Sequence, residues 1–276
     1  MPLCLCGKNK MSKYLLYQNK RIAYQVVGKG KPILLIHGFG EDATVWRNQL
    51  GSLKEKFQLI IPDLPGSGHS EMIDDMSMEG MAEMIKDLIE KEMLPTGNKV
   101  CIIGHSMGGY IALAFAERYP NLLSGFGLFH SSAFADSEEK IATRRKGISF
   151  INHHGAFEFL KTATPNLFSQ LSKDERSELI DEQISLLHNF SPRSLVSYYE
   201  AMIERPDRTN VLRNISVPLI FIMGKYDTAV PMEDGLKQCH LPEKSYIHIL
   251  QNSGHMGMLE EAEKSDQVLE NFLLEI

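Results

Sequence analysis

The clearest chemical signal in the sequence is a serine with a glycine two residues away on either side. Residues 104–108 read Gly-His-Ser-Met-Gly, which matches the pattern G-x-S-x-G. An apolar run at 100–103 precedes this motif, and a helical pattern at 109–119 follows it. A serine on so sharp a strand-to-helix turn has a strained backbone that exposes its hydroxyl, and the glycines prevent clashes there. This context favours Ser106 as a nucleophile over a purely structural turn.

A serine hydroxyl is a weak nucleophile at neutral pH and needs a base, which in this arrangement follows late in the chain. The candidate is His255, which follows the apolar run 246–250 in the sequence Ser-Gly-His. Of the ten histidines, it alone combines a late position, a loop after a strand and a helical pattern behind it. We therefore expect His255 to take the proton of Ser106.

The base needs a carboxylate that fixes its tautomer and stabilises the imidazolium ion. The apolar run 219–223 is followed by Gly-Lys-Tyr-Asp, so Asp227 would lie at the carboxyl end of a strand, beside the loop of His255. The alternative interpretation of Asp227 is a turn or helix-capping aspartate. We expect Asp227 to be the acid of the group.

The charge that develops on an attacked carbonyl oxygen needs two backbone N–H donors. One donor would be Met107, directly after the nucleophile. The other would come from residues 37–40, His-Gly-Phe-Gly, where the glycines let the backbone approach closely. We expect the Phe39 amide to be this second donor and His37 to brace the loop.

These residues need a scaffold, and apolar runs alternate with helical patterns along most of the chain. This alternation predicts a largely parallel sheet covered by helices on both faces. The expected strands are 15–17 and 22–27, joined by a hairpin turn, then 32–36, 57–61, 100–103, 125–129, 219–223 and 246–250. The expected helices outside the long insertion are 44–56, 77–90 and 111–119.

One region interrupts the alternation. Residues 133–208 contain no convincing strand and read as a helical insertion between two strands of the sheet. The helices expected there are 138–150, 156–163, 173–188 and 192–204.

Together these motifs resemble the α/β-hydrolase superfamily, from about Tyr14 to the C-terminus. The resemblance is carried by the elbow at 104–108, the H-G-F-G loop at 37–40, the stretch P-D-L-P-G-S-G-H-S at 62–70, the acid turn at 224–227 and Gly-His at 254–255. It implies an eight-stranded, mostly parallel α/β-hydrolase sheet with helices on both faces and a helical lid. Within the superfamily the chain is similar to the serine-nucleophile, esterase-like branch.

The resemblance also implies a division of the chain and a type of chemistry. Residues 14–132 and 209–276 would form the hydrolase core, 133–208 the lid, and 1–13 an N-terminal extension without fixed order. Some members place the acid after the strand at 125–129, which makes Asp136 an alternative to Asp227. Epoxide hydrolases and haloalkane dehalogenases of this fold use an aspartate nucleophile, so a serine implies an acyl-enzyme instead.

Composition narrows the remaining possibilities. The chain has 276 residues, with 35 acidic and 29 basic side chains, and this excess of acid argues against nucleic-acid binding. Its four cysteines are too few for a disulfide scaffold, and the C-x-C at Cys4 and Cys6 has no matching ligand pair for zinc. We expect no metal, no cofactor and no membrane span, and a cytoplasmic location. The sequence does not indicate a protein partner.

The region at 133–208 would supply most of the substrate pocket. Aromatic and aliphatic side chains are frequent in 133–208 and suit a small or medium apolar acyl group, although most would pack between helices. We expect His130, Phe134 and Tyr198 to contribute to the pocket.

The leading hypothesis for function is a carboxylic ester hydrolase acting on a small-molecule acyl substrate. Thioesterase, lactonase, C–C bond hydrolase, hydroxynitrile lyase and aminopeptidase activities remain open, the last suggested only by Glu200 and Glu204. A different class also remains: a hydrolase-derived small-molecule receptor or stress-signalling regulator. In such proteins slow turnover reports ligand capture.

Overall fold

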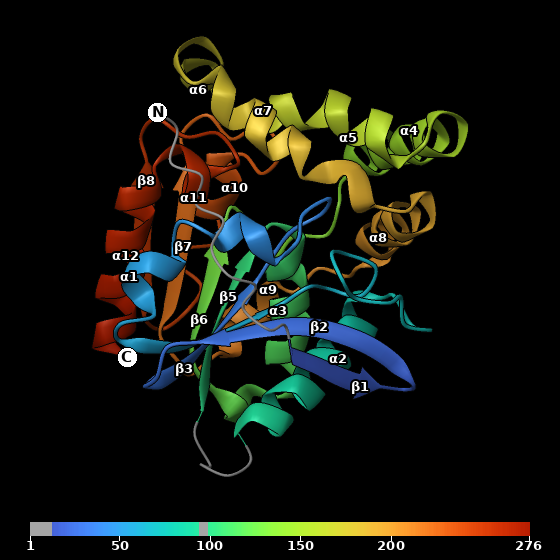
Figure 1. The fold of residues 1–276 in the computed structure, drawn as a ribbon. Helices are drawn as coiled ribbons and strands as arrows, with labels where there is room; N and C mark the ends of the chain where they lie inside the picture. Colours follow the sequence, from blue (N-terminus) through green and yellow to red (C-terminus); the bar gives the residue numbers. More distant parts are fainter. Residues whose placement is uncertain (1–12, 94–98) are drawn as a thin grey trace, which may run out of the picture.

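The structure, a computed structural model, describes residues 13–93 and 99–276. Its strands form one sheet in the order β1-β2-β4-β3-β5-β6-β7-β8 (Figure 1). Strand β2 pairs antiparallel with β1 and β4, and all other neighbours are parallel, which confirms the predicted fold class. The expected N-terminal extension lies outside the described residues except for Lys13, which begins β1. The strands are β1 (Lys13–Tyr17), β2 (Lys20–Val27), β3 (Lys31–Ile36), β4 (Phe57–Pro62), β5 (Val100–His105), β6 (Leu123–Phe129), β7 (Leu219–Gly224) and β8 (Ser245–Leu250).

A two-residue turn joins β1 to β2. Gln18 and Asn19 both have positive φ, at 49° and 62°. This left-handed pair matches the twist of the flanking strands, and asparagine tolerates it better than most residues. The predicted hairpin is therefore present, with Tyr17 opposite Lys20.

Side chains of the central strands point alternately to the two faces of the sheet and pack into two separate hydrophobic cores. On one face, Leu34, Ile102 and Phe126 pack against α2 (Met78–Met93) and α3 (Met107–Arg118). On the other face, Leu35 and Ile103 pack with residues of α11 (Gly257–Glu260) and α12 (Ala262–Glu275). Figure 1 shows the helices of these two sets on opposite sides of the sheet. Burial on both faces explains why the central strands are continuous apolar runs.

Between β6 and β7 the chain is helical. Figure 1 shows α4 to α8 gathered at one end of the sheet, where the parallel strands end. Local sequence signals mark where two of these helices start. Ser137 caps α4, and Ser191 caps α8, which has a proline in its first turn. No helix in the described part of the chain is long and apolar enough to cross a membrane. The helices are α4 (Glu138–His154), α5 (Ala156–Ala163), α6 (Gln170–Glu175), α7 (Ser177–Ser185), α8 (Pro192–Glu204) and α9 (Thr209–Asn214).

Two predicted helices are split in the structure. The helix expected at 173–188 divides into α6 and α7 at Arg176, because Ser169 and Ser172 at the start of α6 bind the buried carboxylate of Glu260. The helix expected at 44–56 is a 3-10 turn at Ala43–Trp46 followed by the short helix α1 (Leu50–Leu53). Near α6 a tertiary contact therefore accompanies the break in the helical pattern, as weak intrinsic propensity allows.

Candidate active site

Ser106 lies on a strained turn between β5 and α3. Its φ and ψ are 50° and −116°, a region that residues other than glycine rarely adopt. A Cβ at Gly104 would lie 2.4 Å from the Gly108 carbonyl oxygen, and a Cβ at Gly108 would lie 2.5 Å from the carbonyl oxygen of Ile36. Both positions therefore require glycine, and the turn holds Ser106 at the carboxyl end of the sheet with the start of α3 beneath it.

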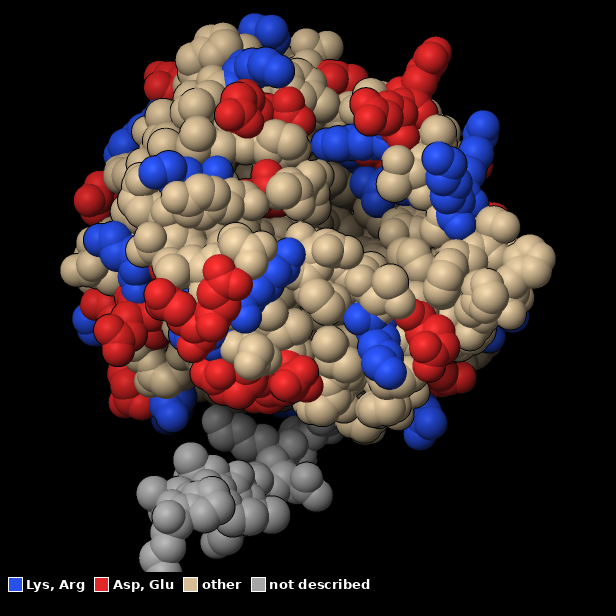
Figure 2. Space-filling model, turned by 90° about the horizontal axis from the view of Figure 1, so that it is seen from above, with Lys and Arg blue, Asp and Glu red and all other residues tan. Residues whose placement is uncertain are grey.

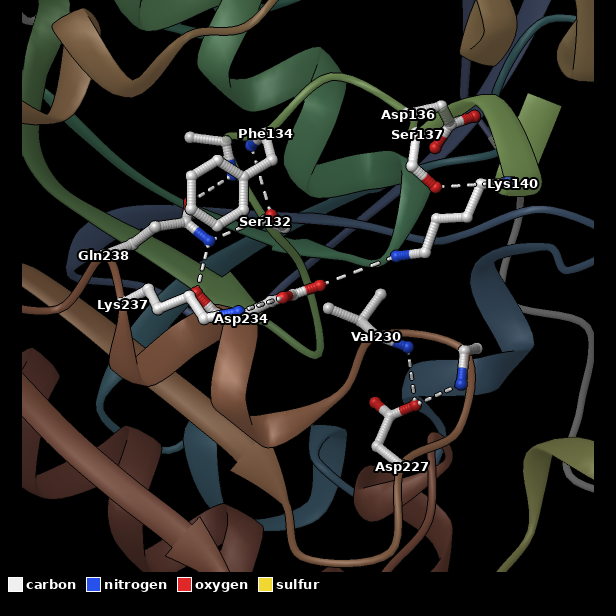
Figure 3. A network of polar contacts seen from close by, with 12 residues as sticks. Ser132, Phe134, Asp136, Ser137, Lys140, Asp227, Val230, Asp234, Lys237 and Gln238 are labelled. Atoms are coloured by element: carbon white, nitrogen blue, oxygen red, sulfur yellow. Dashed lines mark hydrogen bonds and ion pairs between the residues drawn. The ribbon is translucent and has the colours of Figure 1, made fainter.

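Asp227 and His255 form a buried hydrogen-bonded pair. The Nδ1 atom of His255 lies 2.8 Å from Oδ2 of Asp227, and both residues are more than nine-tenths buried. The other carboxylate oxygen, Oδ1, accepts from the amides of Ala229 and Val230, each at 2.9 Å (Figure 3). These amides come from the loop after β7, so the backbone itself sets the orientation of the carboxylate.

His130 is a second imidazole on the same carboxylate. Its Nδ1 atom lies 3.1 Å from Oδ2 of Asp227, while its Nε2 atom accepts from the amide of Gly257 at 3.3 Å. The residue follows β6 and has a φ of 49°, a left-handed conformation that turns its ring toward Asp227. Burial, which outweighs the attraction of Asp227, lowers the pKa of His130 to about 4, so the ring is neutral at pH 7.

The hydrogen bonds fix where the protons lie. An ionised carboxylate only accepts, so Nδ1 of His255 donates and its Nε2 atom keeps a lone pair. Burial alone would raise the pKa of Asp227, but the charges and N–H donors of His255 and His130 outweigh it and the pKa is lowered. For His255, burial opposes the positive charge, yet the Asp227 carboxylate dominates and its pKa is raised. The site thus combines an anionic acid with an imidazole able to accept a proton.

The three residues also meet a geometric condition for a metal site. One ligand atom from each of His130, Asp227 and His255 lies within 4.8 Å of the others, the single such group among the residues that the structure describes. However, both Nδ1 atoms donate to the carboxylate, and its remaining oxygen is filled by two backbone amides. The donor set is therefore committed to hydrogen bonds and does not fit a cation.

Ser106 and His255 face the same cavity, which has a volume of about 510 Å³. Within the described residues, the Ser106 hydroxyl makes no hydrogen bond to the imidazole or to any other group. Contacts between a nucleophile and its base are often long before substrate binds and tighten in the complex. The backbone amide of His255 donates to the carbonyl oxygen of Leu167 at 2.6 Å, so the helical insertion supports the loop that carries His255.

The Phe39 loop borders the cavity on the side of β3. The imidazole of His37 braces it, because its Nδ1 atom donates to the Gly38 carbonyl at 2.9 Å and its Nε2 atom accepts from the Leu64 amide at 2.8 Å. The Phe39 ring lines the cavity and stacks on Tyr199, with centroids 4.3 Å apart. Among described residues, no group accepts a hydrogen bond from the amide of Phe39 or of Met107.

Glu41 and His105 form a buried pair at the site that no sequence motif indicated. Oε2 of Glu41 accepts from the amide of Gly38 at 2.7 Å and lies 2.9 Å from Nδ1 of His105. The Nε2 atom of His105 donates to the carbonyl oxygen of His255 at 3.0 Å. Burial would raise the pKa of Glu41, but His105 and the Gly38 amide lower it. The pair connects the Phe39 loop, the serine turn and the histidine loop.

The three residues expected in the pocket lie elsewhere, so this expectation is corrected. His130 is behind Asp227, as described above. The hydroxyl of Tyr198 is buried against Pro65 and Ser67, whereas its neighbour Tyr199 and also Met202 are the residues of α8 that line the cavity. Phe134 also lies outside the lining, and its carbonyl oxygen accepts from Arg205. The cavity is lined by Phe39, Glu41, Ser106, Tyr110, Ser137, Glu139, Lys140, Thr143, Arg144, Leu167, Tyr199, Met202, Thr228, Ala229, Val230, Pro231 and His255.

The other acidic residues that the sequence suggested for the site also lie outside the cavity lining. The carboxylate of Asp136, the alternative to Asp227, forms ion pairs with Arg144 and Arg205. Glu200 and Glu204 are exposed and do not line the cavity, so they do not form the amine-binding group that an aminopeptidase would need.

Known proteins show the same architecture. The sequence model for the alpha/beta hydrolase fold matches residues 31–147. The chain is 27% identical to a pimeloyl-[acyl-carrier protein] methyl ester esterase from Legionella pneumophila, over 89% of this chain and 96% of that protein. It is also 27% identical to 2-hydroxy-6-oxononadienedioate/2-hydroxy-6-oxononatrienedioate hydrolase 1 from Pseudomonas putida, over 91% of each. A malate-bound thermophilic esterase from Thermogutta terrifontis aligns with a TM-score of 0.89 and 28% identity, covering 96% of this chain and 98% of that one.

Proposed function

Because the chain belongs to the α/β-hydrolase superfamily, we propose that it is a serine hydrolase that cleaves a small or medium carboxylic ester through an acyl-enzyme on Ser106. One observation carries the proposal: the imidazole of His255 is held by Asp227 with a free Nε2 lone pair, in the same cavity as Ser106 on its strained turn. The relatives named above are hydrolases and esterases, which supports the class of reaction.

In the first step Ser106 attacks the ester carbonyl carbon while Nε2 of His255 takes its proton. Asp227 stabilises the resulting imidazolium ion, which agrees with the raised pKa of His255. The negative charge on the tetrahedral oxygen would be held by the amides of Phe39 and Met107, neither of which is used elsewhere in the described structure.

The second step repeats this chemistry with water. His255 gives its proton to the leaving alcohol, and the acyl group remains bonded to Ser106. Water then attacks the acyl carbon while His255 again accepts a proton, and the acid is released with Ser106 regenerated. The cavity volume of about 510 Å³ lies within the range of ~300–1,000 Å³ typical of small-ligand sites.

The proposal is tested by replacing Ser106 with alanine and measuring turnover on 4-nitrophenyl esters from acetate to octanoate. We expect kcat to fall by at least ~10³-fold. The matched control is Ser149→Ala, at an exposed serine on α4, which should retain wild-type kinetics. An aryl fluorophosphonate should label Ser106 in the wild type and the control, but not in the Ser106 variant.

Two outcomes would overturn the proposal. Full esterase activity in Ser106→Ala would exclude this residue as the nucleophile. Turnover near one per minute on every ester, against the usual enzymatic range of ~1–10³ per second, would favour a receptor over an enzyme. Thioesters, lactones and vinylogous diketones in the same panel distinguish ester cleavage from the related activities.

A further inference from the structure

One wall of the cavity is basic. Lys140 and Arg144 lie one turn apart on α4, and both line the cavity that contains Ser106 and His255. Figure 2 shows a hollow in this face of the molecule, with basic side chains gathered along one side of it. The reaction proposed above needs no cation, so this pair of charges requires another explanation.

The positive charge of Arg144 is only partly neutralised. Its guanidinium binds the carboxylate of Asp136, but the same carboxylate also binds Arg205, with Oδ1 2.9 Å from Nη2. The side chain of Asp136 is fully buried, so water does not share the charge. Two guanidinium groups on one carboxylate leave a net positive charge in a region of low dielectric.

Arg205 does not present this charge to the cavity. Its Nη1 atom donates to the carbonyl oxygen of Met202 at 2.6 Å, its Nη2 atom donates to that of Phe134 at 3.1 Å, and its guanidinium stacks on Tyr110 at 3.8 Å. The side chain of Arg205 is 4% exposed, whereas that of Arg144 is 18% exposed. The Nη1 atom of Arg144 has no acceptor among the described residues. The unneutralised charge therefore faces the cavity through Arg144.

The nearby acids leave this charge available. Glu41 is held by the Gly38 amide and by His105, and Glu139 is exposed in the first turn of α4. The Nζ atom of Lys140 points toward Asp234 (Figure 3), but the separation of 3.7 Å is longer than a hydrogen bond. Lys140 therefore adds a second, partly screened positive charge.

We propose that Arg144, assisted by Lys140, binds a carboxylate of the substrate while Ser106 attacks a carbonyl elsewhere in the same molecule. This rests on the function proposed above and names its substrate class: monoesters of dicarboxylic acids, or similar acyl compounds that end in a carboxylate. A guanidinium matches a carboxylate in geometry, and Asp136 already holds Arg144 in place, so little side-chain entropy is lost on binding.

The test uses a matched pair of substrates that differ only in charge. The 4-nitrophenyl hydrogen adipate carries a free carboxylate, and 4-nitrophenyl methyl adipate carries the same chain capped as a neutral ester. We expect the wild type to have at least tenfold higher kcat/KM on the free acid. Arg144→Gln should reduce the ratio of the two kcat/KM values by ~10–100-fold, the usual effect of losing a charge-assisted hydrogen bond.

Two further variants keep the test decisive. Arg145→Gln makes the same change at the neighbouring exposed residue, which lies outside the cavity lining, and should leave the preference unchanged. Lys140→Gln does not touch Asp136, so it should fold normally and reduce the preference by a smaller factor, ~2–5-fold. An unchanged preference in both Arg144→Gln and Lys140→Gln would refute the subsite and leave the serine mechanism standing.

A binding measurement separates this proposal from the function on which it rests. Adipate should bind to the Ser106→Ala protein by calorimetry, and adding Arg144→Gln should weaken binding by at least tenfold. If no ester is cleaved but this difference holds, the serine hydrolase proposal fails and the carboxylate site stands. If adipate binds equally to both proteins or to neither, the carboxylate site is wrong.

Discussion

Replacing Asp227 with asparagine should invert the proton arrangement of the site. Four N–H groups point at the carboxylate: the Nδ1 atoms of His130 and His255 on one oxygen, and the amides of Ala229 and Val230 on the other. Backbone amides cannot become acceptors, so the asparagine oxygen must face Ala229 and Val230. Its NH₂ group then faces both imidazoles, which must present lone pairs at Nδ1.

The cost of this inversion follows from the new tautomers. With Nδ1 as acceptor, His255 carries its proton on Nε2 and cannot accept one from Ser106. The comparable substitution in serine proteases lowers kcat by ~10⁴-fold for the same reason, which corresponds to ~5 kcal/mol in the barrier. His130 would then carry its proton on Nε2, where it faces the N–H of Gly257. This clash of two donors should lower the free energy of unfolding by ~1–3 kcal/mol.

The assay is kcat on a 4-nitrophenyl ester, together with urea unfolding at pH 7. The control is Asp207→Asn, the same substitution at an exposed residue whose carboxylate oxygen accepts from the amide and the hydroxyl of Thr209, which an asparagine oxygen can also do. Asp227→Ala removes the acid without forcing a tautomer and should be no less active than Asp227→Asn. The reasoning fails if Asp227→Asn keeps more than a tenth of wild-type kcat, or if the alanine variant is far less active than the asparagine variant.

Two other predictions concern stability. Because the pKa of His130 is lowered to about 4 from 6.5, the unfolded chain binds one more proton than the folded chain between these pH values. The free energy of unfolding, measured by urea, should therefore fall by ~3 kcal/mol as pH drops from 6.5 to 4. The variant His130→Asn should lack this fall, because asparagine does not titrate; it keeps an N–H donor to Asp227 and tolerates the positive φ. Gly51→Ala should raise the free energy of unfolding by ~0.5–1 kcal/mol, because Gly51 lies on α1 with open space around it and alanine favours a helix. Gly108→Ala should instead prevent folding, because its Cβ would meet the Ile36 backbone. Equal effects of the two glycine changes would contradict this.

Local signals explain why the fold could be predicted. The β-α alternation and the continuous apolar runs require only neighbouring residues, and the sheet they predict is confirmed. The requirement for Gly104 is local, because its Cβ would meet the Gly108 carbonyl four residues on. Gly108 could be recognised only by its place in the motif, because its Cβ would meet Ile36, which is distant in the sequence. The two helices that are split in the structure show the limit, since the contact of Ser172 with Glu260 spans 88 positions.

The cavity wall could not be predicted because it depends on how one helix is rotated. Tyr198 and Tyr199 are adjacent, and successive residues on a helix point about 100° apart, so only one of them faces the cavity. Which one does so is set by the buried contacts of the Tyr198 hydroxyl with Pro65 and Ser67. Arg144 likewise reads in the sequence as an ordinary charged residue of a polar helix. Its significance appears only when Asp136 and Arg205 are placed beside it.

The pair formed by Glu41 and His105 shows how the strained parts of the site are held together. His105 donates to the carbonyl of His255, while Glu41 binds the Gly38 amide beside the Phe39 loop. The two imidazole nitrogens of His105 face Oε2 of Glu41 and the carbonyl oxygen of His255. A shift of any one loop would break one of these hydrogen bonds and leave a buried polar group of another loop unsatisfied, which is costly in a dry interior. The serine turn, the Phe39 loop and the histidine loop should therefore move as one body, and motion that admits substrate should occur in the helices between β6 and β7.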